Sequence, residues 1–292
     1  MIIVKLMGGM GNQMFQYAFG KALATKYNTV LKLDTSFLLD RKPRNNFTFR
    51  DYDLDLFNIE AEFATQEEIE IFTKRLKWII PNKIINRVMG VKESYVIEPH
   101  FHFSERCFNA KDNSYLEGYW QTEKYFYPIK NEIKNKYFSL KESCSSQAQL
   151  LLAEIQSNNA IAVNVRRGDF VNNPFHGTCS PGYYKKGEEI ILSKIDNPYF
   201  FVFSDEIEWA QENLHFSGPV KFVGEEYNGR KFQDKIRLMS ACKHFIISNS
   251  SFAWWAAWLN TNPDKIVIAP KAWFHNSKWD TKDILPPNWI AI

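Results

Sequence analysis

The sequence contains few cysteines, and none of them lies close to another. Cys107, Cys144, Cys179 and Cys242 are far apart along the chain, and no C-x-x-C pair occurs. This spacing excludes a disulfide framework and a cysteine-based zinc site. It suits a reducing compartment.

Long apolar runs and a strong excess of one charge are also missing. The chain begins with the strand-like segment MIIVKLM, without the basic-then-apolar pattern of a signal peptide, and no apolar run is long enough to span a bilayer. The 36 basic and 33 acidic residues leave a net charge of +3. This positive excess is too small to indicate a nucleic-acid-binding protein. We expect a soluble cytoplasmic protein with no nucleic-acid partner and no transmembrane segment, while peripheral membrane association stays open.

Alternating strand and helix patterns predict an α/β protein. Of the 292 residues, 45% are hydrophobic and 16% aromatic, which is enough for one large or two medium domains. The predicted strands are residues 2–6, 29–33, 160–165, 199–203, 220–223, 244–247 and 266–269, and the predicted helices are residues 12–27, 66–78, 231–242 and 250–259. This alternation favours parallel sheets with helices on their faces. We therefore predict two Rossmann-like domains, residues 1–150 and residues 151–292, which face a central cleft.

The most informative motif lies where the predicted strand 160–165 runs into Arg166, Arg167, Gly168 and Asp169. Open α/β sheets build their ligand sites at the carboxyl ends of their strands. Guanidinium groups match phosphate oxygens and stay charged at any working pH. The motif therefore indicates a nucleotide or nucleotide-sugar phosphate, and a salt-bridged surface turn is the alternative interpretation.

Two other predicted strands end in small residues that precede a helix. The glycine-rich loop 8–11 and the segment 248–251 each place backbone N–H groups at a helix N-terminus, which favours anions. The glycine loop lacks a complete G-x-G-x-x-G and the Lys-Ser/Thr of a P-loop. For Asn12 and Ser250, a plain helix cap is the alternative. The helix after Ser251 is apolar almost all round, so we expect its tryptophans in the core.

Two groups of residues imitate metal sites. Asp51, Asp53 and Asp55 have the Asp-x-Asp spacing of many sugar transferases, but strict alternation with Tyr and Leu favours an amphipathic strand with an acidic outer face. His100 and His102 would share a strand face, but no third ligand lies close by in the sequence. We expect neither a metal nor a cofactor.

Four motifs occur in order: GGMGNQMFQYA at residues 8–18, EGYWQTEKYF at 117–126, VRRGDF at 165–170 and SNSSFAWW at 248–255. Together they resemble the α-1,2-fucosyltransferases of glycosyltransferase family 11, and the resemblance extends from the first residues to about Trp273. It implies a GT-B fold and an inverting, metal-independent transfer of fucose from GDP-β-L-fucose to the 2-hydroxyl of a terminal galactose. Animal relatives carry a membrane anchor before the first glycine-rich loop. Without one, this chain resembles the bacterial members, which typically build surface polysaccharides.

The resemblance also implies roles for individual residues, with the acceptor on the first domain and GDP-fucose on the second. Arg166 is expected to stabilise charge on the β-phosphate, and Asp169 is a candidate base, with an ion pair to an arginine as its alternative role. Arg167 is a donor-binding candidate that could instead hold the domain together, because neighbouring strand residues face opposite ways. The other donor-binding candidates are Gly9, Asn12, Gln13, Asn164, Ser204, Asp205, Asn249, Ser250, Ser251 and Phe252, and the acceptor-binding candidates are Tyr119, Trp120 and Gln121.

One position departs from the family pattern. The family usually has a histidine two residues before the paired arginines, and this chain has Asn164 there. Asparagine can hydrogen-bond a phosphate or a ribose, but it cannot be a general base at neutral pH. A base must therefore lie elsewhere. Two alternatives stay open: a catalytically impaired protein that binds a nucleotide sugar or glycan, which Asn164 favours, and a fucosyltransferase of different linkage.

Overall fold

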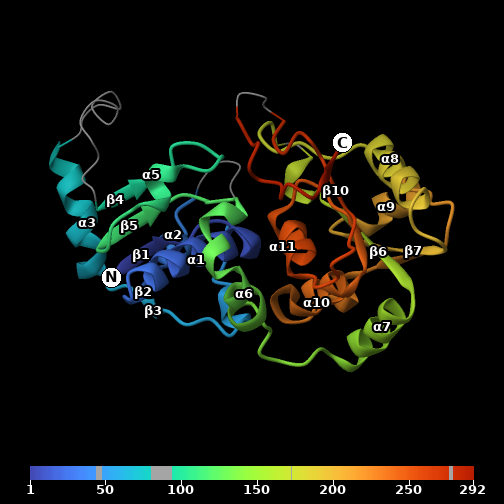
Figure 1. The fold of residues 1–292 in the computed structure, drawn as a ribbon, viewed down its shortest axis with the longest axis horizontal. Helices are drawn as coiled ribbons and strands as arrows, with labels where there is room; N and C mark the ends of the chain where they lie inside the picture. Colours follow the sequence, from blue (N-terminus) through green and yellow to red (C-terminus); the bar gives the residue numbers. More distant parts are fainter. Residues whose placement is uncertain (44–47, 80–93, 172, 276–278) are drawn as a thin grey trace. The chain divides into compact units, whose positions relative to one another are not determined.

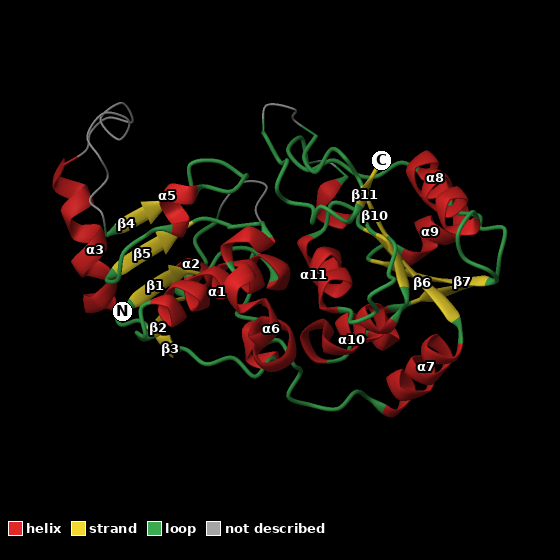
Figure 2. Ribbon diagram, in the orientation of Figure 1, coloured by secondary structure: helices red, strands yellow, loops and turns green. Residues whose placement is uncertain are grey.

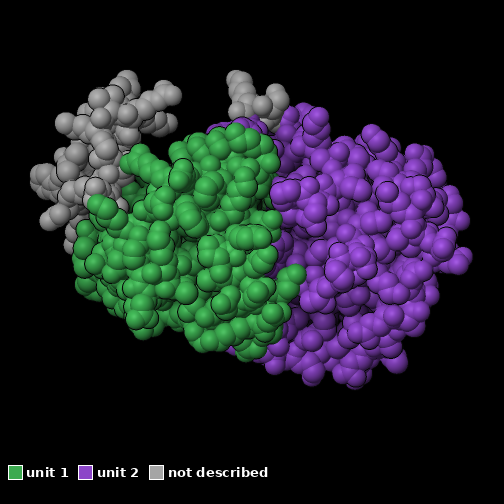
Figure 3. All heavy atoms as spheres, viewed as in Figure 1, with its two compact units in different colours: residues 1–139, 282–284 green, residues 140–281, 285–292 purple. Residues whose placement is uncertain are grey.

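The computed structural model describes residues 1–43, 48–79, 94–171, 173–275 and 279–292 (Figure 1). They form two compact units, coloured separately in Figure 3. Unit 1 comprises Met1–Ser139 and Lys282–Ile284, and unit 2 comprises Leu140–Thr281 and Leu285–Ile292. Each unit is a parallel sheet with helices, as the sequence predicts.

Unit 1 is built around strand β1. Its described strands are β1 (Ile2–Lys5), β2 (Leu31–Asp34), β3 (Glu62–Phe63), β4 (Tyr95–Ile97) and β5 (Ser114–Glu117), in the order β3-β2-β1-β5-β4, and all neighbouring pairs are parallel. Ile2, Ile3 and Val4 of β1 are fully buried. Such a continuous apolar run is typical of a strand that is covered on both faces.

Helix α1 (Met10–Lys26) connects β1 to β2 and completes the predicted βαβ opening. The other described helices of unit 1 are α2 (Ser36–Leu39), α3 (Gln66–Ile79), α5 (Glu105–Phe108) and α6 (Lys130–Glu132), with the short turns η1 (Leu54–Leu56), η2 (Glu123–Tyr125), η3 (Tyr127–Ile129) and η4 (Ile133–Tyr137). α3 confirms the amphipathic helix predicted at residues 66–78.

The prediction of an acidic strand at Asp51, Asp53 and Asp55 is wrong. Asp55 lies in the helical turn η1, and the residues before it have no strand pairing. The Gln13 side chain takes the backbone groups that a ladder would use: its Nε2 donates to Asp51 O at 2.7 Å, and its Oε1 accepts from Asp53 N at 2.9 Å. The alternation in the sequence therefore reflects a loop fixed by one buried amide.

Unit 2 contains a larger parallel sheet. Its described strands are β6 (Asn159–Val165), β7 (Pro198–Ser204), β8 (Val220–Val223), β9 (His244–Ile246), β10 (Val267–Ala269) and β11 (Ile290–Ala291), in the order β11-β10-β9-β6-β7-β8. Its helices are α7 (Ser146–Ser157), α8 (Pro181–Leu192), α9 (Ile207–Asn213), α10 (Gln233–Ala241) and α11 (Ser251–Leu259), with the short turns η5 (Gly168–Phe170), η6 (Glu225–Tyr227) and η7 (Arg230–Phe232). The strand order reverses beside β6, and α8 and α9 lie on the other face of the sheet from α10 and α11 (Figure 2). This is the doubly wound arrangement that right-handed crossovers produce.

The boundary between the units lies earlier than residue 150. The predicted division at residues 150/151 falls inside α7, which begins after the Ser145 cap and packs against β6 and α10 of unit 2. The change of unit is at Ser139 and Leu140 instead. A helix cannot be divided between two cores, so the connection before its cap forms the boundary.

Helix α10 also begins later than the sequence predicts. Lys231 and Phe232 have φ of 48° and 67°, in the left-handed region, so the α-helix starts only at Gln233. Among the helices of the described residues, none combines the length and apolar character needed to cross a membrane.

Candidate active site

The carboxyl ends of β6, β7 and β9 form the candidate donor site of unit 2. The three strands are parallel neighbours, so the segments that follow them meet at one edge of the sheet. β6 leads into Arg166 and Arg167, β7 into Asp205 and β9 into the serine-rich turn before α11. The fold thus brings together two of the motifs that the sequence singles out and the donor-binding candidate Asp205.

Arg166 is held by two carboxylates. Its Nη1 lies 2.8 Å from Asp205 Oδ2, and its Nη2 pairs with Asp169. A guanidinium has five N–H donors, and these ion pairs engage one donor on each terminal nitrogen. The side chain is therefore fixed in direction and still has donors for a phosphate. The structure contains the salt-bridged turn of the alternative interpretation, and this turn orients the arginine.

Arg167 faces helix α9. Its Nε donates to Glu206 Oε2 at 2.8 Å, and its guanidinium carbon lies 3.8 Å from the centroid of the Trp209 ring. Such a stacked, paired arginine anchors a loop to a helix. The geometry therefore favours the domain-holding alternative for Arg167 over contact with the donor.

Asp205 organises the turn after β6. Its Oδ1 accepts from the backbone N–H of Arg167 at 2.8 Å, while its Oδ2 pairs with Arg166. A Cβ at Gly168 would lie 2.8 Å from Asp205 Oδ2, so only glycine allows the carboxylate so close to this backbone. Ser204, the last residue of β7, is buried and accepts from the Glu206 N–H at 2.9 Å.

Lys235 is a further cation at this edge that no sequence motif predicts. Its side chain is buried, and its Nζ donates to Ser204 O at 2.9 Å. Burial lowers the pKa of Lys235, while Asp205 and Glu225 act in the opposite direction. No motif marks this residue, because α10 brings it back to the sheet edge from 31 positions along the chain.

Asn164 is occupied within the protein. It is buried, and its Oδ1 accepts from Ser248 Oγ at 2.6 Å. Tyr184 OH donates to its backbone oxygen at 3.2 Å. This asparagine links β6 to the end of β9, a role that needs no proton transfer.

The serine-rich turn forms an N-cap. Ser250 Oγ accepts from the Ala253 N–H at 3.5 Å, while Ser251 and Phe252 at the helix start are half-buried. Trp254 and Trp255 are fully buried, which confirms that the α11 tryptophans belong to the core.

Asn249 connects three backbone segments beside that cap. Its Nδ2 donates to His176 O at 2.9 Å, to Gly177 O at 3.3 Å and to Trp273 O at 3.1 Å. The buried Oδ1 has no hydrogen-bond partner among the described residues. The amide nitrogen therefore has a structural role, and only the oxygen can serve a ligand.

In unit 1, the glycine-rich loop follows β1. Gly8 has φ of +74°, and a Cβ there would lie 2.4 Å from Asn12 Nδ2, so this position requires glycine. Gly9 is the N-cap of α1. Asn12 lies inside the first turn rather than at the cap, so its alternative role as a cap is wrong. Its Oδ1 accepts from Gln121 Nε2 at 2.7 Å, which joins two of the sequence motifs.

The structure does not support contact of Gln13 with the donor. Its side chain is fully buried. Besides its bonds to the backbone of Asp51 and Asp53, its Nε2 donates to Gly8 O at 2.9 Å. All its amide hydrogens and its oxygen therefore serve the protein.

The three acceptor-binding candidates differ in how far they are buried and in what their side chains contact. Trp120 is fully buried, with ring centroids 4.8 Å from Phe19 and 5.5 Å from Tyr125, so the structure does not support contact of this indole with an acceptor. Tyr119 is half-buried. The Gln121 Oε1 is buried and has no hydrogen-bond partner in the described part of the chain.

Glu98 holds this loop in place and was not predicted. Its Oε2 accepts from the Tyr119 N–H at 2.6 Å and its Oε1 from the Trp120 N–H at 2.9 Å. Burial raises the pKa of Glu98 to about 7, although both N–H groups oppose the rise. Trp120 has φ of 57°, a left-handed conformation that these two hydrogen bonds stabilise.

His100 and His102 follow β4 rather than sharing its face, and their rings stack with centroids 3.4 Å apart. Within the described ranges, no group of three or more His, Cys, Asp or Glu side chains is placed to hold a metal ion.

Comparison with known proteins identifies the family. The model of glycosyl transferase family 11 matches residues 1–292. The chain belongs to glycosyltransferase family 11. An α-1,2-colitosyltransferase of Escherichia coli is 32% identical and covers 100% of this chain and 98% of its own length. The O-antigen biosynthesis glycosyltransferase WbnK of Escherichia coli is 34% identical, and the match covers 98% of this chain and 99% of that protein. A galactoside 2-α-L-fucosyltransferase, Sec1 of Mus musculus, is 25% identical, and the match covers 100% of this chain and 74% of that protein.

Solved structures show the fold of this family 11 enzyme. NodZ α-1,6-fucosyltransferase, soaked with GDP-fucose, has a TM-score of 0.50 and 13% identity, covering 88% of this chain and 92% of that one. A mutant of Arabidopsis thaliana FUT1 in complex with GDP has a TM-score of 0.50 and 12% identity, covering 92% of this chain and 70% of that one. The predicted GT-B fold, with a Rossmann-like α/β unit in each half, is confirmed.

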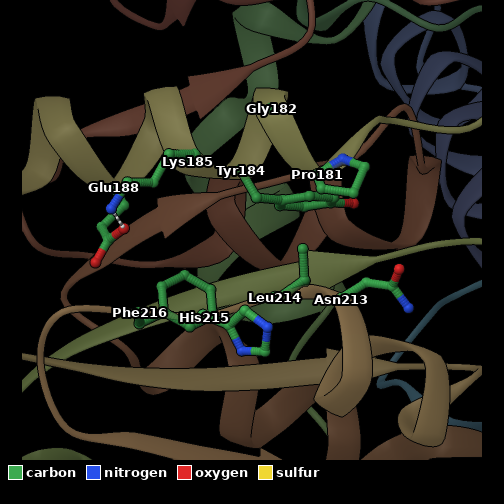
Figure 4. Close-up of a pocket in the computed structure, with 9 residues that line it drawn as sticks. All are labelled: Pro181, Gly182, Tyr184, Lys185, Glu188, Asn213, Leu214, His215 and Phe216. Carbon is green, nitrogen blue, oxygen red and sulfur yellow. Dashed lines mark hydrogen bonds and ion pairs between the residues drawn. The ribbon is translucent and has the colours of Figure 1, made fainter.

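A side pocket of the glycosyltransferase lies between the start of α8 and the residues after α9 (Figure 4). It has a volume of about 400 Å³ and is lined by Pro181, Gly182, Tyr184, Lys185, Glu188, Asn213, Leu214, His215 and Phe216. Lys185 Nζ pairs with the buried Glu188 at 2.8 Å at one end. Its lining contains none of the donor or acceptor candidates.

Proposed function

We propose that this family 11 glycosyltransferase transfers L-fucose from GDP-β-L-fucose to the 2-hydroxyl of a terminal β-galactoside, with inversion and formation of an α-1,2 linkage. The observation that carries the proposal is the fixed Arg166 guanidinium at the carboxyl edge of the unit 2 sheet. The names of the relatives, an α-1,2-colitosyltransferase and a galactoside 2-α-L-fucosyltransferase, support the linkage.

The leaving group determines what the site must do. When the bond between fucose and the β-phosphate breaks, negative charge develops on the phosphate, and donors that are already oriented stabilise it most. Arg166 meets that need, and the capped N-terminus of α11 lies after a neighbouring strand of the same sheet. We therefore assign the nucleotide sugar to unit 2 and the galactose-terminated acceptor to unit 1.

We propose that no divalent metal takes part. Arg166 and the buried Lys235 both supply positive charge to the donor edge. In the Asp-x-Asp segment, the Asp51 carboxylate pairs with Arg41. The compartment that we propose is the cytoplasm, and peripheral membrane association stays an alternative.

Colitose is the second candidate for the transferred sugar. The observation that favours it is the Escherichia coli α-1,2-colitosyltransferase, which matches this chain over its whole length. The chemistry required of Arg166 is the same for a GDP-linked colitose donor, because the leaving diphosphate is then unchanged.

The test is a donor and acceptor panel with the full chain. GDP-fucose and GDP-colitose are each incubated with β-galactosides, GDP release is measured, and the product linkage is determined by NMR. Fucose on the 2-hydroxyl supports the proposal. Transfer of colitose alone favours the second candidate, and a different linkage overturns the α-1,2 assignment. GDP binding without transfer from either donor indicates a catalytically impaired binding protein.

A further inference from the structure

The loop between η5 and α8 brings a histidine to the Arg166 group. The His176 ring stacks on the Phe170 ring, with centroids 4.2 Å apart and planes 6° apart. The same Phe170 ring lies 5.3 Å from the guanidinium carbon of Arg166. One phenylalanine therefore contacts both the expected phosphate-binding cation and an imidazole.

His176 is held from several sides. Its ring meets Phe175 edge-on at 5.0 Å and lies 5.8 Å from Phe274. Its backbone N–H donates to Asn173 Oδ1 at 3.3 Å, and its backbone oxygen accepts from Asn249 Nδ2 at 2.9 Å. A ring packed between aromatic side chains on an anchored loop has a fixed direction, which proton transfer at one atom requires.

The ring nitrogens of His176 make no hydrogen bond within the described part of the chain. Neither nitrogen is sealed from solvent. A neutral imidazole has one nitrogen that accepts a proton. Asp169 differs, because it would have to give up its ion pair with Arg166 to take a proton.

We propose that His176 is the general base of the transferase, an assignment that rests on the proposed function. The acceptor O–H bond breaks, and its proton moves to a ring nitrogen of His176. The oxygen electron pair forms the new bond to the anomeric carbon. The bond from that carbon to the phosphate oxygen breaks, and its electron pair leaves on the β-phosphate beside Arg166. The imidazolium then returns its proton to water.

The charges around the ring suit this step. Burial lowers the pKa of His176, Arg166 acts in the same direction, and Asp169 opposes them. The imidazole is therefore neutral, and able to accept a proton, at neutral pH. His275 is a second histidine beside this loop. Its ring lies next to Gly177, where an added Cβ would be only 3.2 Å away from it. Once the imidazolium forms, the Asp169 carboxylate stabilises it, so Asp169 becomes a positioning residue.

The test compares pH profiles of kcat for three variants. His176→Gln removes the base, and His176→Phe preserves an aromatic ring for the stack on Phe170. Wild-type kcat should fall on the acid side with a midpoint below the ordinary histidine pKa of about 6.5. Both variants should lower kcat by about 10²–10⁴, lose the acid limb and keep the donor KM. His275→Gln is the matched control and should keep the wild-type profile.

Circular dichroism establishes that each variant is folded. If folded His176→Gln and His176→Phe keep wild-type kcat and the acid limb, the inference is overturned while the proposed function stands. If His275→Gln removes the limb instead, the base is assigned to the wrong histidine. A wild-type chain that transfers neither fucose nor colitose removes the proposed function, and the role of His176 with it.

Discussion

Replacing Arg166 tests the leaving-group role. The guanidinium is held at two points, by Asp205 Oδ2 at 2.8 Å from Nη1 and by Asp169 at Nη2. Arg166→Lys keeps the positive charge but has a single nitrogen. That nitrogen cannot keep both ion pairs and also face a phosphate, so the variant loses the fixed orientation rather than the charge.

The magnitude follows from this loss of orientation. A preorganised donor to a developing oxyanion contributes about 10²–10³ in kcat, or about 2.7–4 kcal/mol. The β-phosphate gains its charge only as the bond to the sugar breaks, so kcat should fall more than the affinity for GDP. Arg166→Ala should lower kcat further, because Asp169 and Asp205 would then lack the cation that both pair with.

Arg167 is the matched control for this experiment. Its side chain lies against Glu206 and Trp209. Arg167→Lys should therefore lower the melting temperature and leave kcat near the wild-type value. Steady-state kinetics, calorimetry of GDP binding and circular dichroism are measured for all variants. A folded Arg166→Ala protein with near wild-type kcat would refute the reasoning and direct attention to Arg167.

Three further predictions concern metal dependence, Asn164 and the acceptor loop. Sugar transfer, measured as GDP release, should survive excess chelator, and Asp53→Asn should lower its rate only slightly. Complete loss of transfer in chelator with rescue by manganese would contradict this prediction. Asn164→His should fold and should change donor KM more than kcat, whereas a large gain in kcat would mean that this chain lacks a base at that position. The raised pKa of Glu98 favours its protonated form in the folded state, so the free energy of unfolding should fall as pH rises from about 4.3, the unfolded value, to about 7. In thermal unfolding, the melting temperature of the wild-type protein should fall over this pH range, and Glu98→Gln should flatten the fall. An equal fall in the wild-type protein and the variant would show that another group causes it.

Local patterns predict most of the secondary structure. The apolar run of β6 predicts a central strand, and the all-round apolar helix α11 predicts buried tryptophans; both are found. These features depend on the periodicity of neighbouring side chains, which a single segment contains. The failures come from contacts between residues that are distant in sequence. The aspartates at 51–55 alternate like a strand, but a distant glutamine takes their backbone groups.

The site divides along the same line. Arg166 and the serine cap follow strands directly, and chain order alone predicts that parallel strands bring such residues to one sheet edge. The roles of neighbouring residues within each motif could not be predicted. Three residues are next to plausible ligand-binding residues in the sequence, but their side chains contact other parts of the protein instead: Arg167, Gln13 and Trp120.

Only the tertiary structure brings in the residues that no motif marks. Lys235 reaches Ser204 across 31 positions, and Glu98 binds the backbone of residues more than 20 positions away. His176 joins the Arg166 group through its stack on Phe170. The order of apolar and polar residues along the chain predicts strands and helices, and the four motifs indicate the family. The protonation and direction of a side chain depend on neighbours that are distant in sequence, and the folded core alone decides which neighbours those are.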